Sequence, residues 1–215
     1  VLCLGYRGEM IRRYFLEYAA MACDVTVELG RRGAVQFHGE AAEAGWKVTL
    51  VDTGVEALTG ARLARIRRYV DTDDWMMTYG DGVSDVDLTK LLSFHRKHGK
   101  AATVTGVRPP SRFGDLVTKG DSVTTFSEKP QVHEGLINGG FFVLSRKVFD
   151  YLPDDDGCSF EREPLERLAA DGQLKVFQHE GYWQCMDTYR DWNILQTAWT
   201  QGKAPWASWK RREAK

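Results

Sequence analysis

Short apolar runs alternate with stretches of helical periodicity through the first half of the chain. Residues 1–4, 47–54, 75–79 and 101–107 predict strands, and residues 25–29 and 34–38 predict shorter ones. Between these runs, residues 9–20 and 59–71 place apolar side chains at helical spacing. A further helix is expected between an N-cap at Ser84 or Asp85 and an end at Gly99. Strands that alternate with helices predict an α/β fold with a mixed, mostly parallel sheet flanked by helices.

The second half of the chain has a different pattern. Residues 115–129 alternate apolar and polar positions around a Lys-Gly-Asp turn, which predicts a β-hairpin. A strand over 139–144, a helix over 161–172, a strand over 174–180 and a last helix over 189–202 are expected to follow. The pattern shows no internal repeat and no linker, so we expect one domain over residues 1–215.

Composition excludes several classes of protein. The 215 residues are 43% hydrophobic and 27% charged, and 29 Lys and Arg stand against 30 Asp and Glu, so no global charge favours nucleic acid or anionic lipid. No apolar run is long enough to cross a bilayer. Four widely spaced cysteines without a metal-knuckle pattern favour a reduced, cytoplasmic setting. The chain begins without Met and inside a predicted strand, which we interpret as the mark of a fragment.

Two aspartates are candidates for a metal site. Asp81 follows the strand over 75–79 and lies between Gly80 and Gly82, whose lack of side chains allows a ligand to approach the backbone. Asp187 lies between the strand over 174–180 and the last helix. Mg²⁺ is often held by one or two carboxylates, with waters and substrate phosphates completing its shell. The alternatives are a turn residue for Asp81 and a helix N-cap for Asp187.

Three further segments carry polar groups suited to a phosphorylated sugar. In "FSEKP", Lys129 offers a charge for a phosphate and Glu128 an acceptor for hydroxyls, although a surface Glu-Lys pair is a common alternative. In "INGGFFVL", Asn138 can donate and accept, and Gly139 gives access to the backbone; a β-bulge is an equally good interpretation.

The segment "TGARL" predicts the start of a helix whose amides could face an anion. Thr59 and Gly60 open this helix, and Arg62 lies in its first turn, where a cation is unfavourable unless an anion offsets it. By contrast, His95 and His98 lie in "FHRKHGK", at the end of the helix expected before Gly99. They have no carboxylate partner in sequence, so a cationic helix C-terminus is expected there.

Taken in order, these motifs resemble those of the sugar-1-phosphate nucleotidylyltransferases, and most closely their glucose-1-phosphate cytidylyltransferase branch. The resemblance runs through essentially the whole chain and rests on the segments "VTLVDTG", "LTGARL", "TYGDGVSDVD", "PPSRFG", "FSEKP", "INGGFFVL" and "GYWQCMDT". It implies a Rossmann-like nucleotidyltransferase fold with a small β-hairpin part for the sugar, and the Mg²⁺-dependent transfer of a cytidylyl group from CTP to glucose 1-phosphate. It also implies a homo-oligomer that takes part in polysaccharide biosynthesis.

The resemblance implies a role for each candidate residue. Asp81 and Asp187 would hold Mg²⁺, and Lys129 would hold the sugar phosphate and, with Asp81, serve catalysis. The residues implied to bind nucleotide or sugar are Thr59, Gly60, Arg62, Gly80, Glu128, Asn138 and Gly139.

The chain departs from the family pattern in four places. The Gly-rich loop and the lysine segment that cradle the triphosphate have no match, so we expect little or no pyrophosphorylase activity from this chain. Ala61 and Cys185 stand where the family usually has glycine and proline. A uridylyl- or thymidylyltransferase, and a non-catalytic sugar-nucleotide-binding homologue, are the main alternatives. A glycosyltransferase would not explain "EKP" together with "NGGFF".

Overall fold

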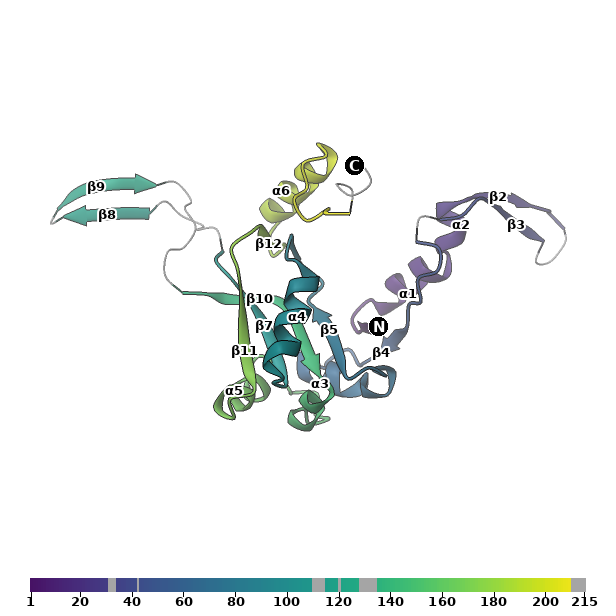
Figure 1. Ribbon diagram of the computed structural model, residues 1–215. Coiled ribbons are helices and arrows are strands. Elements are labelled where there is room, and N and C mark those ends of the chain that lie inside the picture. The colour runs from purple at the N-terminus through teal and green to yellow at the C-terminus, as the bar shows by residue number, and fades with distance from the viewer. Residues whose placement is uncertain (31–33, 42, 110–114, 120, 128–134, 210–215) are drawn as a thin grey trace. The chain divides into compact units, whose positions relative to one another are not determined.

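The computed structural model describes residues 1–30, 34–41, 43–109, 115–119, 121–127 and 135–209, in two compact units. The first unit contains Val1–Asp71 and Phe149–Glu166, and the second contains Thr72–Val148 and Arg167–Lys215. Figure 1 shows the helices and strands of both units. The 3-10 helix η2 (Arg146–Tyr151) and the helix α5 (Glu163–Ala170) each cross from one unit to the other along the chain.

The second unit is built on a four-stranded sheet in the order β11-β7-β10-β5. Its strands are β5 (Asp74–Thr78), β7 (Ala102–Val107), β10 (Ile137–Ser145) and β11 (Leu174–His179). β11 pairs with β7 in parallel, whereas β10 is antiparallel to both β7 and β5. The prediction of a mixed α/β sheet is confirmed, but the described strands of this sheet do not show a majority of parallel pairs.

The core of this unit follows from the apolar runs of the sequence. Phe142, Val143 and Leu144 of β10 are at most 1% exposed, and Ala102 and Val107 of β7 are equally buried. The helix α4 (Leu88–His98) contacts β7, β10 and β11, as the ribbon in Figure 1 also shows. A strand covered on both faces is expected to be apolar throughout, which explains why β10 and β7 were found from sequence.

The N-terminus of α4 corrects one prediction. The N-cap is Asp87, whose carboxylate accepts a hydrogen bond from the Lys90 amide at 3.0 Å, and not Ser84 or Asp85. That hydrogen bond holds the pKa of Asp87 below its usual value. The chain stays extended up to Ser84 because residues 82–84 pair with another strand, and this pairing delays the helix. The C-terminus is as predicted, because Gly99 ends the helix in the left-handed region at φ 63°.

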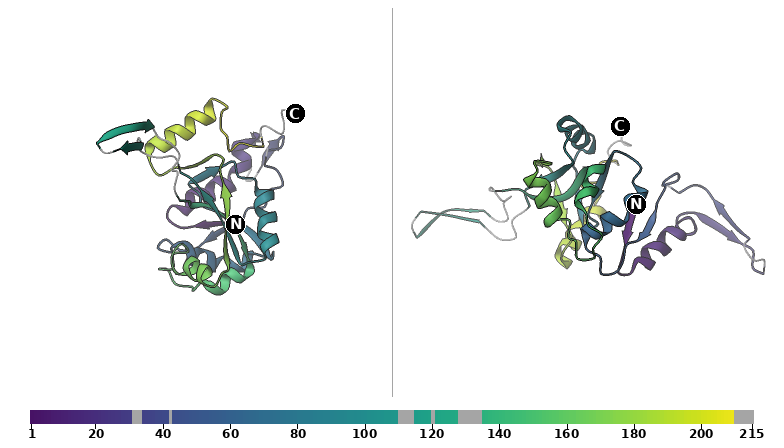
Figure 2. Two further views of the ribbon diagram at one scale, coloured as in Figure 1. Left: turned by 60° about the vertical axis from the view of Figure 1, so that its left-hand side comes forward. Right: turned by 90° about the horizontal axis from the view of Figure 1, so that it is seen from below.

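The first unit contains a parallel pair of short strands, β1 (Leu2–Leu4) and β4 (Leu50–Asp52). Between them run α1 (Gly8–Leu16), α2 (Tyr18–Ala22) and an antiparallel hairpin of β2 (Asp24–Val27) and β3 (Val35–His38). The right-hand view of Figure 2 shows this hairpin extending from the helical segment. After β4 come α3 (Thr59–Arg65) and the 3-10 helix η1 (Arg67–Tyr69). The strand predicted over 47–54 is therefore real but shorter.

Three further elements lie outside the two sheets described above. β8 (Asp115–Lys119) and β9 (Ser122–Ser127) form the predicted antiparallel hairpin. The helix α6 (Tyr189–Thr200) begins with a capping box, in which Thr188 and Asp191 exchange side-chain and backbone hydrogen bonds. Among the described residues, no helix is long and apolar enough to cross a membrane.

Candidate functional site

A two-stranded ribbon in the second unit brings Asp81 and Asp187 to the same place. β6 (Gly82–Ser84) pairs antiparallel with β12 (Trp183–Cys185), so that Gly82 lies opposite Cys185. Just beyond this pair, the Met186 amide donates to the Asp81 carbonyl at 2.7 Å. Asp187 directly follows Met186, so the two aspartates occupy neighbouring positions at one end of the ribbon. Strands of three residues carry almost no periodic signal, and the ribbon could not be predicted from sequence.

Asp187 is not the N-cap of the last helix. Thr188 is the N-cap of α6, because its hydroxyl accepts from the Asp191 amide at 3.2 Å. Asp187 instead accepts a hydrogen bond from the Cys185 thiol at 3.4 Å through Oδ2. Both Asp81 and Asp187 are exposed, so their carboxylates are accessible to a ligand.

The donor chemistry at this end of the ribbon fits Mg²⁺. Two accessible carboxylates from separate segments are what a hard, oxygen-binding cation requires of a protein when substrate phosphates and waters supply its other ligands. Within the described residues, no group of three or more His, Cys, Asp or Glu side chains is arranged to enclose a metal. Asp81 and Asp187 present two exposed carboxylates at one end of the ribbon, and their role as metal ligands stays a prediction.

Gly80 has no packing reason to be glycine in the described structure. A Cβ built on it would meet no atom within 4 Å, and its φ lies outside the left-handed region. A side chain at this position would project into open space beside Asp81. A role for Gly80 in letting a ligand approach the backbone stays a prediction.

Asn138 lies at a bulge where β10 loses its register with β7 between Asn138 and Phe142. Its Oδ1 accepts from the Gly140 amide at 2.8 Å, and its Nδ2 donates to the Tyr79 hydroxyl at 3.2 Å. Together these two bonds fix which way the carboxamide faces. A carboxamide has two N–H groups and two lone pairs on oxygen, so one donor and one acceptor remain for a ligand. Asn138 is exposed, which allows that use.

Gly139 is needed for packing as well as for any ligand. A Cβ at Gly139 would lie 2.7 Å from Val107 Cγ1 and 3.0 Å from the Thr105 carbonyl oxygen on β7. The strands at the bulge are therefore too close for a side chain. The bulge that we held open as an alternative is present, and it does not conflict with a binding role for Asn138 beside it.

The candidate residues of the first unit have partners inside that unit. The amides of Gly60 and Ala61 donate to the Cys158 carbonyl at 2.9 and 3.2 Å. The Thr59 hydroxyl donates to Glu161 at 2.6 Å and accepts from the Phe160 amide at 2.9 Å. The expected anion-facing amides at the start of α3 thus bond to a neighbouring loop.

Arg62 also has partners within the first unit. Its guanidinium donates to the Leu4 carbonyl at 3.1 Å and to the Thr53 hydroxyl at 2.8 Å, which joins the ends of β1 and β4. These partners are neutral oxygens, so the anion that we inferred a cation at this position to need stays a prediction. A role for Thr59, Gly60 and Arg62 in nucleotide binding stays a prediction. Glu128 and Lys129 lie outside the described residues.

Comparison with known proteins gives the family. Residues 59–193, more than half of the chain, match the family model described as "Nucleotidyl transferase". The chain belongs to the nucleotidyl transferase family. It is 44% identical over 211 residues to the glucose-1-phosphate cytidylyltransferase of Salmonella typhimurium, covering 98% of this chain and 81% of the relative. It is 32% identical over 197 residues to the mannose-1-phosphate guanylyltransferase catalytic subunit beta of Dictyostelium discoideum, covering 89% of this chain and 48% of the relative.

The likeness of this chain to solved structures is weaker than its sequence identity to the relatives above. The structure of the inositol-1-phosphate CTP transferase from T. maritima superposes with a TM-score of 0.45 at 16% identity, covering 66% of this chain and 62% of that one.

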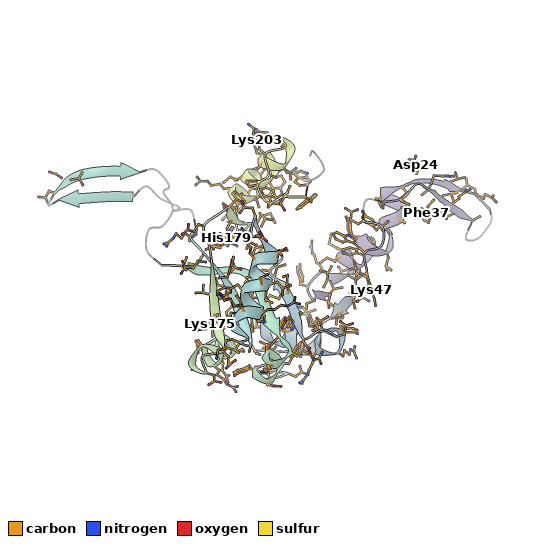
Figure 3. All side chains as sticks on the ribbon, viewed as in Figure 1. Asp24, Phe37, Lys47, Lys175, His179 and Lys203 are labelled. Carbon is orange, nitrogen blue, oxygen red and sulfur yellow. The ribbon has the colours of Figure 1, made fainter. Side chains whose placement is uncertain are left out.

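In this nucleotidyl transferase, Asp85 makes polar contacts beside the ribbon that the sequence did not indicate. Asp85 Oδ1 accepts from the Tyr182 amide at 2.7 Å and lies 3.1 Å from His179 Nε2. His179 is the last residue of β11 and is labelled in Figure 3. A Cβ at Gly181 would lie 2.5 Å from the same carboxylate oxygen. Asp85 therefore fixes the turn that leads from β11 into β12, and with it the path towards Asp187.

His95 and His98 do not form the cationic helix end that we expected. His95 is 2% exposed, and its Nε2 lies 3.6 Å from the Asp74 carboxylate on β5. Both imidazoles contact the Thr103 hydroxyl, through His95 Nδ1 at 2.8 Å and His98 Nε2 at 2.7 Å. The Lys100 amide donates to His98 Nδ1 at 2.9 Å. This set of bonds is satisfied by neutral imidazoles, because His98 Nδ1 must accept.

We expect this histidine cluster to make the fold less stable in mild acid. Burial lowers the pKa of both His95 and His98 below the usual 6.5. The unfolded chain then binds more protons than the folded chain, so the free energy of unfolding falls as pH drops below about 6.5. Each histidine adds a slope of at most about 1.4 kcal/mol per pH unit. The charged and titratable groups that face the pair are Asp74, Arg96, Lys100 and Lys175.

Urea unfolding between pH 7.5 and 5 measures this slope. His95→Gln should flatten it, whereas His38→Gln on the exposed hairpin should leave it unchanged. An unchanged slope in His95→Gln would mean that other groups govern the acid response.

Proposed function

We propose that this chain is a glucose-1-phosphate cytidylyltransferase that makes CDP-glucose and pyrophosphate from CTP and glucose 1-phosphate. The observation that carries the proposal is that Asp81 and Asp187 occupy neighbouring positions at one end of the β6–β12 ribbon. Identity to a relative of that name over almost the whole chain supports the choice of nucleotide and sugar.

The reaction needs positioning and charge neutralisation more than a protein nucleophile. A phosphate oxygen of glucose 1-phosphate forms a bond to the α-phosphorus of CTP, and the bond from that phosphorus to the bridging oxygen of pyrophosphate breaks. Asp81 and Asp187 would hold Mg²⁺. Mg²⁺, when bound, neutralises phosphate charge. In this arrangement Gly80 lets the reacting phosphates approach the backbone beside Asp81.

The remaining residues have substrate-binding roles in the proposal. Lys129 holds the sugar phosphate and its developing charge, and Glu128 accepts from glucose hydroxyls. Asn138 offers its remaining donor and acceptor to the glucose, beside Gly139. Thr59, Gly60 and Arg62 bind the nucleotide or its phosphates.

Other properties belong to the same proposal. The family resemblance supports three of them. These are a single nucleotidyltransferase domain over residues 1–215, a mostly parallel sheet and a cytoplasmic setting. Assembly into a homo-oligomer is supported by exposed apolar side chains in the first unit, among them Tyr14, Leu16 and Phe37. Sedimentation velocity would show a monomer if this assembly does not occur.

Binding of the product CDP-glucose tests the proposed choice of nucleotide and of sugar in one experiment. We expect isothermal titration to give a dissociation constant for CDP-glucose at least about tenfold below those for UDP-glucose and dTDP-glucose, with tighter binding when Mg²⁺ is present. A tenfold ratio corresponds to about 1.4 kcal/mol, which one or two base-specific hydrogen bonds can supply.

The same titrations separate the alternatives. Preference for UDP-glucose or dTDP-glucose would assign the chain to another nucleotide. A dissociation constant for CDP-glucose that is the same with and without Mg²⁺ would favour a non-catalytic homologue. Pyrophosphate release with CTP and glucose 1-phosphate, measured alongside, tests the low turnover expected from the sequence.

A further inference from the structure

One hydrogen bond joins the two parts of the site in the second unit. The indole N–H of Trp183 donates to the Gly139 carbonyl at 2.8 Å. Trp183 begins β12, the strand that leads to Asp187, and Gly139 lies in the bulge of β10 beside Asn138. A single side chain thus connects the strand that carries a proposed metal ligand with the segment proposed to contact glucose.

The bulge needs this partner. Gly139 is buried and lies where β10 has lost its regular pairing with β7. A buried carbonyl without a donor costs about 1–3 kcal/mol. Phe has no donor, and Tyr and His place theirs differently, so tryptophan is the side chain that both fills this position and bonds the carbonyl.

Tyr79 also bonds to this bulge. Its hydroxyl accepts from Asn138 Nδ2 at 3.2 Å, and its backbone amide donates to the Gly140 carbonyl at 3.1 Å. Tyr79 directly precedes Gly80 and Asp81 at the end of β5. Tyr79 therefore holds the carboxamide of Asn138, and Trp183 holds the adjacent backbone at Gly139, so that the bulge is bonded to both of the segments that carry the aspartates.

We propose that Trp183 is a positioning residue that determines sugar selectivity by fixing Asn138 relative to the metal-binding aspartates. This inference rests on the proposed function, because it requires Asn138 to bond sugar hydroxyls. A site built to hydrogen-bond a hydroxyl discriminates strongly only while its donors and acceptors stay in place, and a displacement of about 1 Å is enough to weaken it. Without the bond to Gly139, the bulge and Asn138 become more mobile. The backbone bonds of the β6–β12 ribbon, and with them the positions of Asp81 and Asp187, remain.

Trp183→Phe removes the indole N–H and keeps an aromatic ring. We expect isothermal titration to show the affinity for glucose 1-phosphate falling about tenfold. Galactose 1-phosphate differs from glucose 1-phosphate in the configuration of one hydroxyl, and its affinity should fall less. The ratio of glucose 1-phosphate affinity to galactose 1-phosphate affinity should therefore drop at least about threefold. The free-energy cost of losing one hydrogen bond to a buried carbonyl is large enough for these changes in affinity. Mn²⁺ affinity without sugar, measured by electron paramagnetic resonance, should change less than about twofold.

Two further variants make the result specific. Trp192→Phe is the matched control, because Trp192 lies on α6, is 42% exposed and stacks on Tyr189. It should leave both sugar affinities and Mn²⁺ binding unchanged. If Trp183→Phe does not fold, benzothienylalanine at position 183 keeps the bicyclic shape without the N–H and should give the same drop in selectivity.

Three results would overturn the inference. An unchanged glucose-to-galactose ratio in a folded Trp183 variant would show that the bond does not set selectivity. A fall in Mn²⁺ affinity as large as that for the sugar would show a general structural role. Absence of glucose 1-phosphate binding by the wild-type chain would remove the proposed function itself, and this inference with it.

Discussion

Asp81→Asn and Asp187→Asn are each expected to weaken Mn²⁺ binding at least about 100-fold, measured by electron paramagnetic resonance on the folded chain. Even outer partners of a metal site typically contribute 10- to 100-fold to affinity, and a direct carboxylate ligand contributes more because it also supplies the charge that opposes the cation. The asparagine side chain keeps the size of the aspartate, so the β6–β12 ribbon should persist. Its register depends on backbone bonds, including that from Met186 to Asp81.

The two substitutions should not be additive. If both carboxylates bind one ion, the double variant should be little worse than either single variant, because residues that act as a unit lose their function together. Asp150→Asn is the control. Asp150 is an exposed carboxylate of the first unit with an ion pair to Arg67 at 3.9 Å, and its loss should not affect Mn²⁺ binding. Full Mn²⁺ affinity in either single variant would exclude that aspartate as a ligand.

The same pair of variants separates metal binding from sugar binding. CDP-glucose should lose its Mg²⁺-dependent gain in affinity in both variants, while retaining the part of its affinity that depends on the base and the sugar. Loss of all CDP-glucose binding would instead indicate that the carboxylates hold the ligand directly or support the fold around it.

The sequence was most informative where one physical requirement dominates. β7 and β10 were found because a strand buried on both faces must be apolar, and Gly99 was found because a helix ending in the left-handed region favours glycine. Asp81 and Asp187 were singled out because ligands collect at the ends of strands. Their proximity, however, depends on a ribbon of three-residue strands, which no periodicity reveals.

The sequence was least informative where one residue type satisfies several requirements. A Cβ at Gly60 would clash with Cys158 Sγ, so close packing is a second reason for glycine there, and the role of Gly60 in nucleotide binding stays a prediction. His95 was assigned to a charged helix end because its carboxylate partner, Asp74, is remote in sequence. Long-range partners decide both cases, and a single sequence does not contain them.

Gly140→Ala is expected to destabilise the second unit by about 3 kcal/mol and to reduce glucose 1-phosphate affinity more than about tenfold. Gly140 has φ of +76°, a conformation that costs a residue with a Cβ about 1–2 kcal/mol. The added Cβ would also lie 2.7 Å from the Tyr79 ring, and overpacking of this kind typically costs about 1–3 kcal/mol more. Sugar binding should suffer because the Gly140 amide donates to Asn138 Oδ1.

Gly99→Ala separates the two contributions. Gly99 has φ of +63°, close to that of Gly140, but a Cβ there would meet no atom within 4 Å. We therefore expect this variant to lose only about 1–2 kcal/mol and to keep full affinity for the sugar phosphate. Urea unfolding, with hydrogen exchange of the β10 amides as a local probe, measures the difference. If Gly140→Ala and Gly99→Ala lose equal stability, the Tyr79 ring moves aside at no cost. Tyr79 and Gly140 would then hold Asn138 less rigidly than their hydrogen bonds to it imply. If stability differs but sugar affinity does not, Asn138 does not contact the sugar, because its bond to Gly140 could not be disturbed without consequence for a ligand that depends on it.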